Sequence, residues 1–82
     1  MAERPDAGVL EKARRDAGLS LDELWLRYFE LTGQASLLEL EAYLRGALIP
    51  DRLQHDLIAQ ALNERFLELG MDHPVPYHQT VE

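Results

Sequence analysis

Apolar residues recur every three or four positions along most of the chain, which is the spacing of helices that bury one face. Four such segments stand out, at about 7–17, 21–32, 37–46 and 52–69, with only a few residues between them. No segment alternates apolar and polar residues for long enough to predict a strand. The pattern therefore predicts an all-α fold, a compact four-helix domain with short loops, in which some neighbouring helices cross at steep angles.

Capping residues and glycines mark the ends of these segments. Two pairs have the spacing of capping boxes, Ser20 with Glu23 and Ser36 with Glu39. The candidate caps of the first and fourth segments are Asp6 and Asp51, and Gln54 has the spacing to close a third box with Asp51. The glycines expected to end the helices are Gly18, Gly33, Gly46 and Gly70.

The width of each apolar face predicts how much of the helix the core covers. The second segment has the widest face and is expected to be central, with an inward side made of Leu21, Leu24, Trp25, Tyr28, Phe29 and Leu31. The third is expected to bury Leu37, Leu40, Tyr43, Leu44, Ala47 and Leu48. The fourth has two stripes, and so two sides in contact: Leu53, Leu57 and Ala61, and Ile58, Leu62, Phe66 and Leu69. The first has a narrow stripe suited to the edge of the core: Val9, Leu10, Ala13 and Ala17.

Residues 72–82 predict a different kind of structure, because Pro74 and Pro76 flank Val75. Prolines in this arrangement favour extended backbone. We expect an extended, proline-containing C-terminal tail, which is either laid over the helices or disordered.

The composition indicates one folded domain spanning 1–82. Apolar residues make up 46% of the chain and charged residues 28%, as in ordinary globular proteins. There is no cysteine, so the domain has no disulfide framework. No apolar run approaches the roughly 18 residues that a bilayer span needs, and residues 1–10 do not form a signal peptide. We expect a cytoplasmic protein with no membrane partner.

The charge is acidic and unevenly distributed. The formal net charge is −7, and from residue 16 onward four arginines face twelve acidic residues. Such a surface repels phosphate backbones, so nucleic acid is not the expected partner. The cations that leave this alternative open lie in the first predicted helix, and they are Lys12, Arg14 and Arg15.

Candidate chemistry is sparse. The sequence contains no nucleophile motif, no phosphate-binding glycine loop and no HExxH, so we expect no enzymatic activity and no cofactor. His55 lies among apolar helix positions and is expected to be partly covered. His73 and His78 fall in the tail, where two histidines alone make a poor metal site, and we expect no bound metal.

Three residues lie away from the apolar faces of their own helices. Leu26 falls outside the face of the second helix, and Leu38 and Ala42 fall outside that of the third. Such residues either meet another helix or form an exposed patch, and exposed apolar patches mark partner sites. The favoured prediction is a non-enzymatic protein-interaction or regulatory module, whose partner is another protein or a second copy in a homodimer.

Two resemblances bear on function. The run Gly18-Leu19-Ser20, followed by 22–25 and 37–44, resembles the helical ANTAR domain, a family that binds RNA hairpins in transcription antitermination. That resemblance implies the alternative function, a nucleic-acid-associated regulator of the antiterminator type. The run 18–25, with 61–66 and His73-Pro74, is also similar to short helical actinobacterial proteins, which implies no particular activity.

Overall fold

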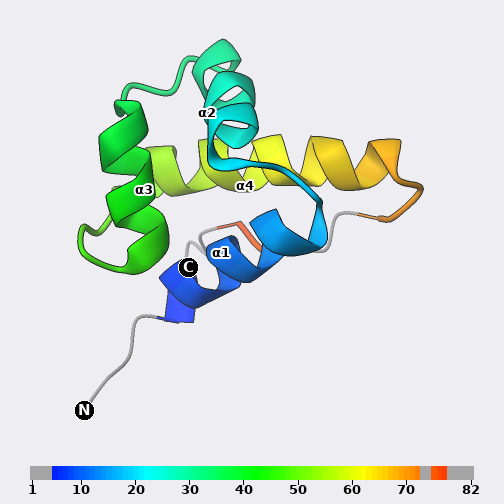
Figure 1. Ribbon diagram of the computed structural model, residues 1–82, viewed down its shortest axis with the longest axis horizontal. Coiled ribbons are helices and arrows are strands. Elements are labelled where there is room, and N and C mark those ends of the chain that lie inside the picture. Colours follow the sequence, from blue (N-terminus) through cyan, green and yellow to red (C-terminus); the bar gives the residue numbers. More distant parts are fainter. Residues whose placement is uncertain (1–4, 73–74, 78–82) are drawn as a thin grey trace, which may run out of the picture.

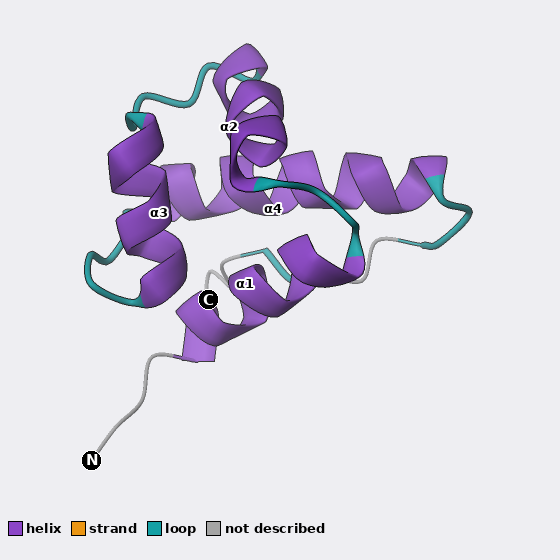
Figure 2. Ribbon diagram, in the orientation of Figure 1, coloured by secondary structure: helices purple, strands orange, loops and turns teal. Residues whose placement is uncertain are grey.

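The computed structural model describes residues 5–72 and 75–77 of the 82-residue chain (Figure 1). Four α-helices follow one another: α1 (Pro5–Asp16), α2 (Leu21–Glu30), α3 (Leu37–Arg45) and α4 (Arg52–Glu68). Loops connect them, and the described residues contain no strand (Figure 2). The predicted all-α, four-helix fold with short loops is therefore confirmed, and each helix boundary lies within two residues of its predicted position.

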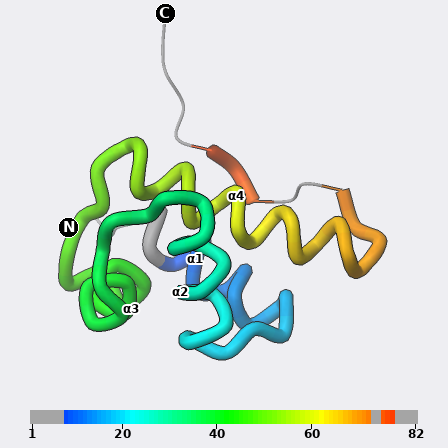
Figure 3. Tube along the Cα trace, turned by 90° about the horizontal axis from the view of Figure 1, so that it is seen from above, coloured from blue at the N-terminus to red at the C-terminus, as the bar shows by residue number. Residues whose placement is uncertain are grey.

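The helices pack in a closed arrangement in which each contacts two others. Both α3 and α4 pack against α1 and against α2. The longest helix, α4, runs nearly horizontally behind α2 in Figure 1, so that these two helices cross steeply. Seen from above, α2 and α3 lie on one side of the molecule and α4 on the other (Figure 3). The domain measures 35 × 30 × 22 Å.

A single apolar core fills the space between the four helices. Its largest fully buried side chains come from every helix, and include Leu10, Leu24, Tyr28, Leu40, Ile58 and Leu62. Helix α4 has the most buried residues, because it packs against α1 and α2 and also contacts residues 75 and 76. The prediction that the fourth helix has more than one neighbour is confirmed.

Hydrogen bonds at the helix starts confirm three of the predicted caps. The Ser20 hydroxyl accepts from the Glu23 N–H at 3.1 Å while the Glu23 carboxylate accepts from the Ser20 N–H at 2.8 Å. Ser36 and Glu39 repeat this box at the start of α3 with the same distances. Asp51 accepts from the Gln54 N–H at 2.8 Å.

Two predicted details of the helix starts are wrong. Gln54 does not close a third box, because its side chain turns inward to the Tyr28 hydroxyl. Asp6 is not an N-cap, because α1 begins at Pro5 and so includes Asp6 in its first turn. Proline suits that position, since the first helical residue needs no hydrogen-bonded N–H.

Three of the four predicted glycine ends are confirmed by left-handed backbone at Gly18, Gly46 and Gly70. The end of α2 differs, because Thr32 takes the left-handed conformation with φ 74°. Its N–H donates to Phe29, and the N–H of Gly33 donates to Tyr28, as in the glycine-ended helices. Gly33 has another role: a Cβ there would lie 2.3 Å from ring atoms of Tyr28.

Several residues predicted for the core are exposed instead. In α2 and α3 the neighbouring helices cover only part of the predicted face, which leaves Phe29 and Leu37 outside it. Three exposed residues follow the last residues of α3 and α4, so helical spacing does not place them: Ala47, Leu48 and Leu69. The remaining exposed positions lie toward the starts of α4 and α1, and they are Leu53 and Val9.

Only part of the predicted tail is described. Val75 is buried against α4, where the Asn63 side chain donates to its carbonyl and accepts from its N–H, both at 2.9 Å. His55 Nε2 lies 3.4 Å from the Pro76 carbonyl and is buried, more completely than predicted. His73 and His78 lie outside the described residues, as do Pro74 and the end of the tail.

Candidate protein interface on α2 and α3

Helix α2 has an exposed apolar side opposite its buried one. Leu24 and Tyr28 point into the core with no exposed surface, whereas Leu26 is 53% and Phe29 56% exposed. Leu26 and Phe29 are three residues apart, so they are neighbours on the same side of the helix. The apolar pattern places Leu26 outside the buried face but assigns Phe29 to the core. The three-residue spacing between them was the available signal that the two belong together.

Trp25 connects this side of α2 to the start of α3. Its ring stacks on that of Phe29, with centroids 5.0 Å apart and an interplanar angle of 20°. Its indole N–H donates to the Ala35 carbonyl at 2.9 Å, and Ala35 is buried in the core. The hydrogen bond fixes the indole, and the stack in turn restricts the Phe29 ring. The exposed aromatic side chain therefore rests on a rigid support.

The third helix begins directly after Ala35 and is also exposed and apolar there. Leu38 is 74% exposed, and Leu37 beside it is also exposed. Ala42 lies one turn after Leu38 on the side of α3 away from buried Leu40, and is half-buried. Of the three residues predicted for an interface, Leu26 and Leu38 thus lie on the surface and outside the core. We call Trp25, Leu26, Phe29, Leu37 and Leu38 together the α2–α3 face.

Acidic side chains border this face on the side of Leu26. A hollow of about 560 Å³ lies there, with Leu19 and Leu26 as its apolar residues and glutamates of α2 and α4 around it. Arg27 holds Glu68 through two hydrogen bonds of 2.9 Å, and Arg65 approaches the same carboxylate at 3.3 Å. The Arg27 bonds, followed by those from Arg65, keep the pKa of Glu68 below its ordinary value.

The cations of the nucleic-acid alternative do not form a common surface. Arg14 donates twice to Glu11, at 2.7 and 2.9 Å, and once to the Leu19 carbonyl. Arg15 also reaches Glu11, at 3.0 Å. Lys12 pairs with Asp16 at 2.7 Å and lines a different hollow from the two arginines. Each of the three cations is therefore paired with an acid of α1, with Glu11 shared by the two arginines, and Arg14 also joins α1 to the loop before α2.

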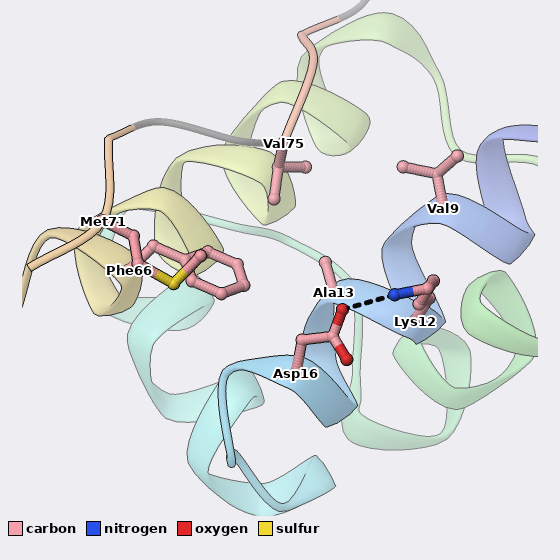
Figure 4. Close-up of a pocket in the computed structure, with 7 residues that line it drawn as sticks. All are labelled: Val9, Lys12, Ala13, Asp16, Phe66, Met71 and Val75. Atoms are coloured by element: carbon pink, nitrogen blue, oxygen red, sulfur yellow. Dashed lines mark hydrogen bonds and ion pairs between the residues drawn. The ribbon is translucent and has the colours of Figure 1, made fainter. Parts of the chain in front are cut away.

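A second, more apolar hollow of about 350 Å³ lies between α1, the end of α4 and residue 75 (Figure 4). The buried side chains of Ala13, Phe66 and Val75 line it together with the more exposed Val9 and Met71. The Lys12–Asp16 ion pair supplies its polar edge. Met71 and Phe66 form the apolar contact expected after a glycine-ended helix.

No three histidine or acidic side chains among the described residues lie close enough together to hold a metal ion. Burial raises the pKa of Tyr28 and of Tyr43, so both hydroxyls give up their protons less readily than an exposed tyrosine does. Within the described ranges, no helix has both the length and the apolar character required to cross a bilayer.

Comparisons with protein-family models, with curated proteins and with solved structures give no match to this chain. The resemblances to ANTAR domains and to short actinobacterial proteins stay predictions.

Proposed function

We propose that this chain is a non-enzymatic protein-interaction module that binds its partner through the α2–α3 face. The observation that carries the proposal is the exposure of Leu26, Phe29 and Leu38 on two adjacent helices, beside a tryptophan that is itself hydrogen-bonded to the turn between them. Aromatic side chains such as Trp25 and Phe29 are enriched in the cores of protein interfaces. Exposed apolar side chains grouped on a surface mark partner sites.

Capping boxes at Ser20 and Ser36 support the same proposal. Both helices of the face begin with their first N–H groups satisfied, and the Trp25 bond ties their connecting turn. A preorganised surface loses less conformational entropy on binding than a flexible one. The antiterminator-type alternative has less support, because Lys12, Arg14 and Arg15 are paired with acids of α1.

Site-specific photo-crosslinking tests the proposal. A benzophenone amino acid replaces Phe29 or Leu38 in one pair of variants, and Leu67 in a control variant. Leu67 is 50% exposed but lies on α4, so it matches the others in exposure and differs in place. After irradiation in the native host, we expect discrete adducts from positions 29 and 38, and none of the same mass from position 67.

Adducts at the mass of two copies would identify the partner as the chain itself. Equal adducts from all three positions, or none from positions 29 and 38, would contradict the proposed interface. Thermal unfolding of each variant shows whether the substitutions leave the fold intact, which we expect because all three side chains lie on the surface.

A further inference from the structure

The surface beside Leu26 carries more negative charge than its arginines can compensate. Arg27 and Arg65 both bind Glu68, and Arg65 also donates to the Ala17 carbonyl at 3.0 Å. Glu30 and Glu64 line the same hollow, are exposed, and make no ion pair among the described residues. With Glu23, four glutamates surround the hollow against two arginines, so an excess of two negative charges stands next to an exposed leucine.

This combination matches the side chain of lysine or arginine. Such a side chain has an apolar stem and a charged end, and it covers apolar surface while its charge stays at a polar edge. In the hollow, the stem would lie over Leu19 and Leu26 and the charged end would reach Glu30 or Glu64. The apolar part of the α2–α3 face, with Phe29 exposed beside it, would take an apolar side chain of the same ligand.

We propose that the partner presents a basic amphipathic helix to the α2 side of the α2–α3 face. This inference rests on the proposed function and specifies its ligand. The exposed side of α2 is 10 residues, or about 15 Å, long, which matches an antiparallel or parallel helix of three turns. An amphipathic helix laid with its apolar side in an apolar groove is a common mode of peptide recognition. Lysine or arginine residues flanking that side meet Glu30 and Glu64.

The same charges disfavour a second copy as the ligand. In a two-fold symmetric dimer the same patch meets itself, with each residue contacting a different residue of the other copy and the reverse. The α2–α3 face contains no lysine or arginine, so a second copy docked through this face would leave Glu30 and Glu64 without a cation from the partner. Charge complementarity across the interface would then be missing.

Trp25 provides the readout for a test, because it is the only tryptophan of the chain and belongs to the face. Two synthetic helical peptides without tryptophan are titrated against the full chain. Both carry the same leucine and phenylalanine face, but one has lysines at the flanking positions and the other glutamates. We expect the lysine peptide to change the Trp25 emission saturably, and the glutamate peptide to leave it unchanged.

Charge variants separate a local contact from attraction to an acidic protein in general. The double variant Glu30→Gln, Glu64→Gln removes two charges at the hollow. The control Asp16→Asn, Glu41→Gln removes two charges elsewhere, from surface ion pairs of α1 and α3. We expect the first to weaken binding of the lysine peptide roughly tenfold, as two lost charge contacts would, and the second to change it less than about twofold.

The possible outcomes distinguish this inference from the proposed function. Equal weakening by both double variants, or no response of Trp25 to the lysine peptide, overturns the inference. A glutamate peptide that changes the emission also overturns it while leaving the face in place as an interface. Absence of adducts from positions 29 and 38 in the crosslinking experiment contradicts the proposed function itself.

Discussion

Two adjacent residues, Thr32 and Gly33, determine how α2 ends, and they do so for different reasons. Thr32 adopts a left-handed conformation that is unfavourable for a β-branched side chain. Gly33 is required because the Tyr28 ring leaves no room for a Cβ. At this helix end, Thr32 therefore has the strained backbone, and Gly33 is the residue that cannot carry a side chain.

Opposite effects on stability are expected at these two positions. Thr32→Gly should raise the free energy of unfolding by about 1 kcal/mol, because it relieves the left-handed conformation of an exposed residue. Gly33→Ala should lower it, because the added methyl group forces the Tyr28 ring to move. Urea denaturation measures both values, and a Thr32→Gly variant less stable than the parent would contradict the assignment of strain.

Tyr28 also illustrates how a buried polar group fixes a turn. Its hydroxyl accepts from the Ala35 N–H at 2.8 Å and donates to Gln54, whose side-chain oxygen also accepts from the Gln34 N–H at 3.2 Å. One side chain of α2 and one of α4 therefore satisfy the backbone of the turn before α3.

Removing the Tyr28 hydroxyl should be costly. We expect Tyr28→Phe to lower the free energy of unfolding by about 2 kcal/mol, because the buried Ala35 N–H loses its acceptor. Tyr43→Phe is the matched control, since the Tyr43 hydroxyl makes no hydrogen bond among the described residues and the side chain is only half-buried. Thermal and urea unfolding compare the two, and equal losses would refute the role of the Tyr28 hydroxyl.

At the scale of elements, the side chain of Arg14 joins α1 to the loop before α2. Arg14 binds Glu11 one turn earlier and the Leu19 carbonyl in the following loop. The hydrogen bond from Arg14 is the largest cause that holds the pKa of Glu11 below its ordinary value of 4.5. A carboxyl whose pKa is lower in the folded state than in the unfolded state stabilises the folded state at pH values above its unfolded pKa.

This arrangement predicts a pH dependence. The contribution of Glu11 should be fully present above its unfolded pKa and decline as the pH falls below about 5, through the folded pKa. Glu11→Gln should therefore show a shallower loss of stability in acid than the parent. A series of urea denaturations from neutral to acidic pH gives both curves, and parallel curves would argue against the pair.

For the whole molecule, the four helices and most of their caps followed from apolar spacing and local backbone chemistry. These are properties of neighbouring residues, which is why Ser20, Ser36 and three of the four glycine ends were predicted correctly. The Gln54 side chain turns inward because it bonds to Tyr28 and Gln34, which are 20 or more residues away in the sequence. The Asn63 side chain turns inward because it bonds to Val75 of the tail. The exposure of Phe29, which stacks on Trp25, was not predicted, because helical spacing does not indicate which part of an apolar face the neighbouring helices cover.

The charge distribution also acts at this scale. We expect no submicromolar binding of duplex DNA or of RNA hairpins at about 150 mM salt, because the acidic surface repels phosphate and the cations of α1 are paired. A gel-shift titration measures this. Tight binding that is lost on neutralising Lys12, Arg14 and Arg15 would instead favour the antiterminator-type alternative.

The contact between Asn63 and Val75 has a consequence for the order of folding during synthesis. Until residue 75 has left the ribosome, the Asn63 amide lacks both of its backbone partners, and one flank of α4 lacks its cover. The nascent chain can form its helices earlier, because their contacts are local. Val75 is the last of the core residues to be translated. The packing of α4 therefore cannot be completed before Val75 has been synthesised.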